Sequence, residues 1–108
     1  MKWYKNLYLG EMIAPKARQI VNKIKKKKLT PDVYVIALAS NPLNQLDVIA
    51  TWELLQPGYP KEHVRIVGLA QGKKEALEVV TAIVEEIYQN TGDVKISDYL
   101  RNKWREST

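Results

Sequence analysis

The chain has 108 residues, a formal net charge of +5, one histidine and no cysteine. This length predicts a single domain over residues 1–108. The lack of cysteine excludes disulfide bonds, thiolate catalysis and cysteine-ligated zinc. No apolar run approaches the length of a membrane-spanning helix, and no apolar stretch of a signal peptide follows the first residues. We therefore expect a cytoplasmic protein with no membrane contact, no metal site and no cofactor.

Residues 2–9 could form a first strand that ends at Gly10. Pro15 suits the first turn of a helix, where its missing N–H costs nothing, and apolar residues at helical spacing carry this helix to about Lys28. The turn Thr30-Pro31-Asp32 ends it. The segment Val33–Ala39 is nearly all apolar and predicts a central strand that is buried on both faces.

A near repeat organises the rest of the chain. Val35–Asn41 aligns with Ile66–Gly72, and Leu46–Ile49 aligns with Leu77–Val80 at the same offset of 31 residues. Each copy reads as a buried strand, a polar break and an amphipathic helix. Two successive strand–helix units indicate a parallel sheet, because parallel strands need a crossover between them.

The elements that follow from the repeat are a helix over about 44–55, a strand over 64–70 and a helix from about residue 73 to residue 91. A short amphipathic helix from Ser97 completes the chain. The predicted fold is a small three-layer α/β/α domain. Its mainly parallel sheet has three strands in the order (β)αβαβα, with the short C-terminal helix added.

Parallel strands gather their exit loops at one edge of a sheet, where open α/β folds usually bind ligands. The residues that we expect there are Ser40, Asn41, Gln71, Gly72 and Lys73. Gly72 would let the backbone approach an anion, the opening amides of the next helix would bind it, and Lys73 would neutralise it. The alternative is that Gly72 only forms a tight turn and that Lys73 is solvated.

Catalysis is less expected than binding, although an enzyme acting on a phosphorylated or carboxylated small molecule stays open. Ser40 lacks a base, because His63 precedes a strand and belongs at the opposite edge of a parallel sheet. Glu11 and Asp47 could form a carboxylate pair. Neither a Walker A motif nor the pattern G-x-G-x-x-G is present.

Positive charge is concentrated near the start of the chain, where residues 1–31 hold nine Lys or Arg and one Glu. Lysines near a helix C-terminus could attract nucleic acid weakly and without reading its sequence. They also stabilise the helix dipole, which is the plainer interpretation. The lysines of this polyanion patch are Lys23, Lys25, Lys26, Lys27 and Lys28.

A narrow sheet has edges that need protection, and self-association is one solution. The aromatic candidates for a contact are Trp3, Trp52, Tyr59 and Trp104. Alternatively, the C-terminal helix covers the exposed side of the sheet. The function that these observations favour is a non-catalytic module that forms a homodimer or larger homo-oligomer, or docks on a protein partner. Such a module could also bind a small anionic ligand.

The runs Val35–Pro42 and Val67–Ala76 together resemble a family of small bacterial α/β proteins of about this length. The similarity extends over most of the chain. The resemblance implies a bacterial, free-standing single domain. It implies no activity, cofactor or catalytic residue, because none is attached to that family.

Overall fold

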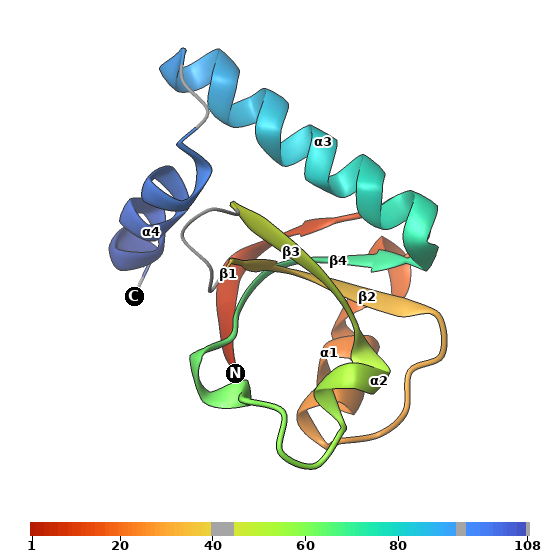
Figure 1. Cartoon of the computed structure of the whole chain (residues 1–108). Coiled ribbons are helices and arrows are strands. Elements are labelled where there is room, and N and C mark those ends of the chain that lie inside the picture. Colours follow the sequence, from red (N-terminus) through yellow and green to blue (C-terminus); the bar gives the residue numbers. More distant parts are fainter. Residues whose placement is uncertain (40–44, 93–94, 108) are drawn as a thin grey trace.

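The computed structural model describes residues 1–39, 45–92 and 95–107 and shows a small α/β domain (Figure 1). Its sheet has four strands in the order β1-β4-β2-β3. β1 is parallel to β4, whereas β2 is antiparallel to both β4 and β3. The predicted three-stranded, mainly parallel sheet is therefore wrong, and the sheet is mixed. The strands are β1 (Lys2–Leu9), β2 (Val33–Leu38), β3 (Leu46–Ala50) and β4 (Arg65–Gln71).

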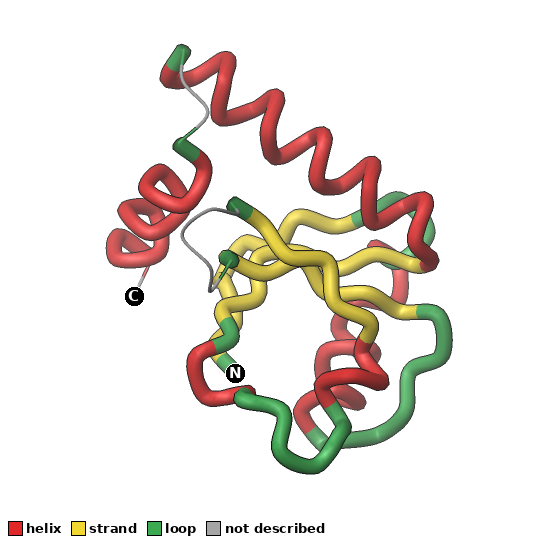
Figure 2. The backbone as a smooth tube through the Cα atoms, viewed as in Figure 1, coloured by secondary structure: helices red, strands yellow, loops and turns green. Residues whose placement is uncertain are grey.

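Helices cover both faces of the sheet, as Figures 1 and 2 show. α3 and α4 lie on one face, and α1 and α2 lie on the other. The three-layer arrangement follows from two apolar clusters, one on each side of the sheet. The helices are α1 (Ala17–Lys25), α2 (Thr51–Leu54), α3 (Gly72–Thr91) and α4 (Ile96–Ser107), with the short 3₁₀ turns η1 (Ala14–Lys16) and η2 (Lys61–His63).

β2 runs through the middle of the sheet, as the sequence predicts. Its side chains alternate between the two cores: Val33 and Val35 pack on the side of α1, and Ile36 packs on the side of α3. β4 lies on one side of β2 and β3 on the other. An apolar run without polar alternation fits this position, since both faces of the strand are covered.

The predicted helix over 44–55 is wrong in its first half. Residues 46–50 form β3, in which Leu46 pairs with Leu38 and Ala50 with Tyr34. Only Thr51–Leu54 is helical within the described part of that range. Pairing with β3 satisfies backbone groups on the side of β2 that would otherwise be a buried, unpaired edge.

α3 confirms the predicted helix from about residue 73 to residue 91, including its end at Gly92. Gly92 adopts φ 69°, and its amide donates to the carbonyl of Tyr88, which is a usual way to end a helix. Leu77 is 54% exposed, whereas Val79 is only 5% exposed, because the helix turns residues 76, 79, 83 and 87 toward the sheet.

Candidate functional site

The mixed sheet separates the loops that the sequence analysis placed together. Val33 pairs with Gln71 and Ala37 with Ile66, so β2 ends where β4 begins. Ala39 and Gly72 therefore lie at opposite ends of the sheet. Ser40 and Asn41 lie outside the described residues. The prediction that the exits of β2 and β4 share a crevice is wrong, because the two strands are antiparallel.

The end of the sheet at Gly72 is already filled by internal contacts. Gly72 adopts φ 81°, and its amide donates to the carbonyl of Asp32 over 2.7 Å. The side-chain amide of Gln71 donates to the same carbonyl over 3.1 Å. A Cβ at Gly72 would lie 3.4 Å from Oδ2 of Asp32, so a carboxylate stands beside the turn. Anion binding by Gln71, Gly72 and Lys73 stays a prediction, and this charge opposes it.

A second carboxylate, that of Glu75, is buried at the same end. It accepts hydrogen bonds from the backbone amides of Met12, Ile13 and Gln71, with N···O distances of 2.9, 3.3 and 3.0 Å. Gly10 lies so close that a Cβ there would overlap this side chain. The carboxylate therefore fastens the loop after β1 to the start of α3. We call these contacts the closed end of the sheet.

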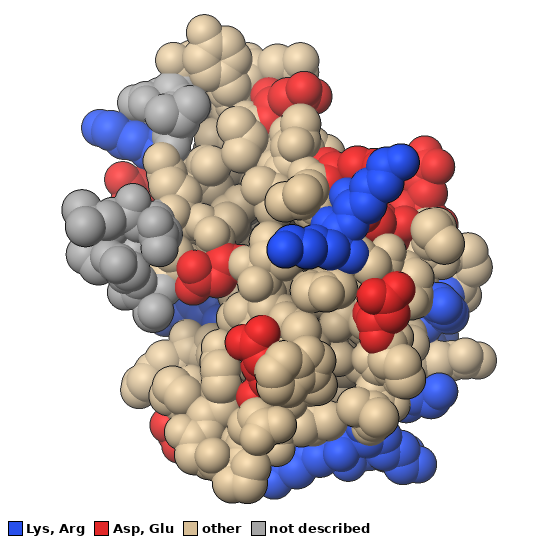
Figure 3. Space-filling model, turned by 45° about the vertical axis from the view of Figure 1, so that its right-hand side comes forward, with Lys and Arg blue, Asp and Glu red and all other residues tan. Residues whose placement is uncertain are grey.

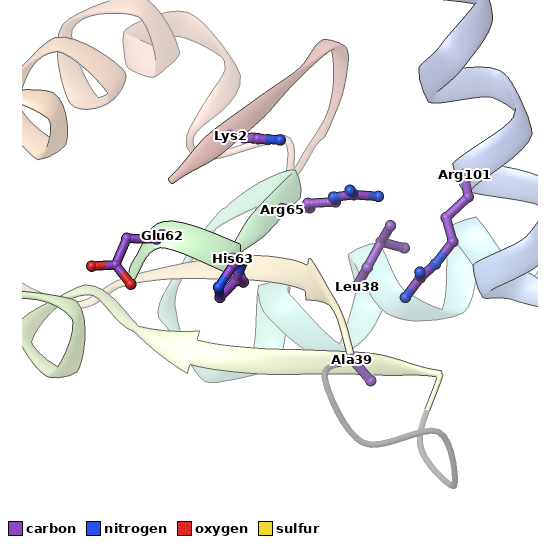
Figure 4. Close-up of a pocket in the computed structure, with 7 residues that line it drawn as sticks. All are labelled: Lys2, Leu38, Ala39, Glu62, His63, Arg65 and Arg101. Carbon is purple, nitrogen blue, oxygen red and sulfur yellow. The ribbon is translucent and has the colours of Figure 1, made fainter. Parts of the chain in front are cut away.

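The opposite end of the sheet is hollowed. A cavity of about 270 Å³ lies where β1 and β4 begin, next to the end of β2 and beside α4 (Figure 4). This volume is near the lower limit of small-molecule sites. We call it the basic pocket. It is lined by Lys2, Leu38, Ala39, Glu62, His63, Arg65 and Arg101.

Each basic side chain comes from a different element. The parallel register of β1 and β4 pairs Lys2 with Arg65. Arg101 lies on α4, next to Leu100, which is fully buried in the core beneath that helix. His63 ends η2 just before β4. In Figure 4 the side chains of Lys2 and Arg65 extend toward the space that Arg101 enters from α4.

The electrostatics of the basic pocket favour an anion. Of the described residues that line it, Glu62 alone is acidic. Its carboxylate points away from Arg65 and Arg101 in Figure 4. Positive groups that share a cavity repel one another, and a bound anion would relieve that repulsion. His63 adds a ring with one donor and one acceptor nitrogen in its neutral form.

A second, more apolar cavity of about 200 Å³ adjoins the basic pocket and shares Leu38 and His63 with it. Tyr59 is a polar member of this apolar cavity. Burial raises the pKa of Tyr59, and the carboxylates of Glu53 and Asp47 raise it further, so its hydroxyl stays protonated and can donate. The lining residues are Ala37, Leu38, Asp47, Ile49, Tyr59, Pro60, His63 and Val64.

Two expectations about catalytic groups need correction. His63 lines a cavity together with Ala39, so it lies at the same end of the sheet as the exit of β2. Glu11 follows β1 at the closed end, whereas Asp47 pairs with Ala37 near the start of β4. Glu11 and Asp47 are therefore not a carboxylate pair.

Sequence reasoning missed the basic pocket, because Lys2, Arg65 and Arg101 stand far apart in the chain and form no motif. The available signal was weak: basic residues begin two of the strands. Only the register of β1 against β4 and the docking of α4 bring the three together.

The lysine run lies at the end of α1 and in the turn after it. Lys27 adopts φ 59°, and the amide of Lys28 donates to the carbonyl of Lys23, which is the hydrogen bond of a Schellman C-cap. Nζ of Lys25 lies 5.8 Å from the ring centre of Trp3. Figure 3 shows basic side chains gathered along this lower end of the molecule. Nucleic-acid binding by the run stays a prediction, and the position of Lys23 and Lys25 in the last turn of α1 fits the alternative, in which they stabilise the helix dipole.

The expected aromatic contacts are only partly exposed. Trp52 is 56% exposed, whereas Trp3 and Tyr59 pack against the core on the side of α1. The side chain of Trp104 lies outside the described ones. α4 buries Ile96 and Leu100 against the other core, which supports the alternative that the C-terminal helix covers the sheet.

Within residues 1–39, 45–92 and 95–107, no helix has the length and apolar character needed to cross a membrane. The same ranges hold no cluster of three His, Asp or Glu side chains able to bind a metal ion. Comparison with protein-family models, curated proteins and solved structures finds no match for the chain. The resemblance to the small bacterial proteins therefore stays a prediction.

Proposed function

We propose that the chain binds a small anion with more than one negative charge, a phosphorylated or carboxylated compound, in the basic pocket. The observation that carries the proposal is the meeting of Lys2, Arg65 and Arg101 in one cavity. Arginine binds phosphate and carboxylate groups with two parallel hydrogen bonds, which suits a cavity with two guanidinium groups.

The apolar cavity supports an organic ligand rather than a bare inorganic ion. A ligand whose charged group lies in the basic pocket could place an apolar part against Ile49 and Val64 across the shared wall of His63 and Leu38. The hydroxyl of Tyr59 and the carboxylate of Asp47 could then hydrogen-bond a polar substituent.

Calorimetric titration with pyrophosphate, inorganic phosphate and phenyl phosphate tests the proposal. We expect pyrophosphate to bind more tightly than phosphate because it carries more charge. Phenyl phosphate should also exceed inorganic phosphate if the apolar cavity is used. Replacing Arg65 with Gln should weaken the binding of pyrophosphate at least about tenfold, since a charge-assisted hydrogen bond contributes roughly 1.5–3 kcal/mol.

Arg18→Gln is the matched control, because Arg18 is exposed on α1 and does not line the basic pocket. It removes the same charge and should leave pyrophosphate binding unchanged. Equal weakening by the two variants would mean diffuse attraction to a basic protein and would refute the site. No heat and no amide shifts with any of the three probes would refute it as well.

A further inference from the structure

An open groove lies between β1 and α1 and shares no lining residue with the basic pocket. Its volume is about 630 Å³. We call it the edge groove. It is lined by Lys5, Asn6, Leu7 and Leu9 of β1 and by Ala17, Arg18, Val21, Asn22 and Lys25 of α1.

The strand wall of the edge groove is a free edge. β1 is the first strand of the sheet order, and no described strand pairs with its outer side. The pairing of β1 with β4 shifts register between Trp3 and Tyr8, so residues 4–7 bulge. A bulge of this kind re-aims side chains at the edge of a sheet. Here Lys5 and Leu7 line the groove.

The far face of β1 holds this wall in place. The rings of Tyr4 and Tyr8 stack, and the hydroxyl of Tyr8 donates to the carboxylate of Glu86 on α3. Tyr4 is 5% exposed. A strand that is held against the core and has a free outer edge can take up an extended chain along that edge.

The helix wall has a regular spacing. Ala17, Val21 and Lys25 follow one another at intervals of one helical turn, and Arg18 and Asn22 form a parallel row beside them. The groove therefore has an apolar floor beneath polar and basic rims. Each of its described charged side chains, those of Lys5, Arg18 and Lys25, is basic and exposed.

We propose that the edge groove docks an extended acidic segment of a partner polypeptide. Its apolar side chains would pack on Leu7 and Val21, its carboxylates would pair with Lys5 and Arg18, and Asn6 and Asn22 would hydrogen-bond its backbone. Charge complementarity selects an acidic partner. A nucleic acid fits less well, because single strands bind on aromatic platforms and the groove has an aliphatic floor.

The test uses the intact chain and a short labelled peptide that alternates glutamate with leucine, followed by fluorescence anisotropy and amide shifts. We expect saturable binding with shifts confined to residues 5–9 and 17–25. The same peptide with glutamine in place of glutamate should bind at least about tenfold more weakly if several ion pairs form. Equal binding of the two peptides would overturn the proposal.

Two double variants separate this surface from the basic pocket. The variant Lys5→Gln/Arg18→Gln removes one cation from each wall of the edge groove. The variant Lys2→Gln/Arg65→Gln removes the same amount of charge from the basic pocket. We expect the first variant to bind the acidic peptide about tenfold more weakly and the second to bind it as the unchanged chain does. Equal effects of both variants would refute a specific groove.

An oligothymidylate of matched length is the competing occupant. Tighter binding of this strand than of the acidic peptide, with shifts at residues 5–9 and 17–25, would assign the groove to nucleic acid and overturn the proposal. Shifts from the peptide at residues 26–28 alone would assign its binding to the lysine run instead. Pyrophosphate binding in the basic pocket is independent of these outcomes.

Discussion

The two ends of the sheet carry charged side chains of opposite sign and differ in how those side chains are satisfied. At the closed end, the carboxylate of Glu75 accepts three backbone amides, and Asp32 accepts the amide of Gly72. At the other end, Lys2, Arg65 and Arg101 surround a cavity. Polar groups satisfied within the chain stabilise the fold, whereas charges that share an open cavity remain available to a ligand.

The largest effect is expected from Gly10→Ala at the closed end. The new Cβ would overlap Glu75 and displace its carboxylate from the three amides, so we expect a loss of about 4 kcal/mol in the free energy of unfolding. Urea denaturation measures it. The double variant Gly10→Ala/Glu75→Ala should be no less stable than Glu75→Ala alone, because the overlap is gone. Additive losses would show that the glycine is needed for another reason.

Glu75→Ala should cost about 3 kcal/mol, because it leaves the amides of Met12, Ile13 and Gln71 without their acceptor. Glu78→Ala is the matched control on an exposed position of the same helix and should change stability by less than about 0.5 kcal/mol. Similar losses for the two variants would remove the distinction between the closed end and an ordinary surface.

Gly72→Ala should cost about 1–2 kcal/mol, which is the usual penalty for a side chain in the left-handed region. Space is not the limit, since the new Cβ would lie 3.4 Å from Asp32, an ordinary contact. The loss should leave pyrophosphate binding unchanged, because Gly72 lies at the other end of the sheet. Weaker pyrophosphate binding by Gly72→Ala would instead support the site expected from the sequence.

The smallest effect on the free energy of unfolding is expected at the basic pocket. Arg65→Gln should change the free energy of unfolding by less than about 0.5 kcal/mol without ligand, as surface substitutions usually do. With pyrophosphate present, the intact chain should gain stability by mass action, and the variant should gain much less. Thermal unfolding with and without the anion measures both. A large loss without ligand would mean that Arg65 serves the fold.

The near repeat shows the limit of predicting secondary structure from a short segment of sequence. Leu77–Val80 lies inside a helix of 20 residues, whose apolar positions recur at helical spacing up to Ile87. The similar segment Leu46–Ile49 forms a strand. Four residues of this composition suit either structure, and the shorter segment lacked the long periodic context. Pairing with β2 then decided its conformation.

One wrong element displaced the predicted site. A helix between β2 and β4 implies a crossover and parallel strands, whereas the strand β3 makes β2 and β3 an antiparallel pair and leaves β2 antiparallel to β4. Ala39 thereby moves to the end of the sheet that holds His63 and away from Gly72. The predicted meeting point of the two strand exits is therefore wrong, and anion binding by Gln71, Gly72 and Lys73 stays a prediction.

The sequence by itself determined the α/β class, the strands β1, β2 and β4, the long helix α3 with its glycine cap and the terminal helix α4. These depend on periodicity, apolar runs and caps, which are interactions between near neighbours. The tertiary structure alone decided β3, the direction of β2 and the meeting of Lys2, Arg65 and Arg101. Strand pairing joins residues far apart in the chain, and its energy depends on which backbone groups would otherwise remain unpaired.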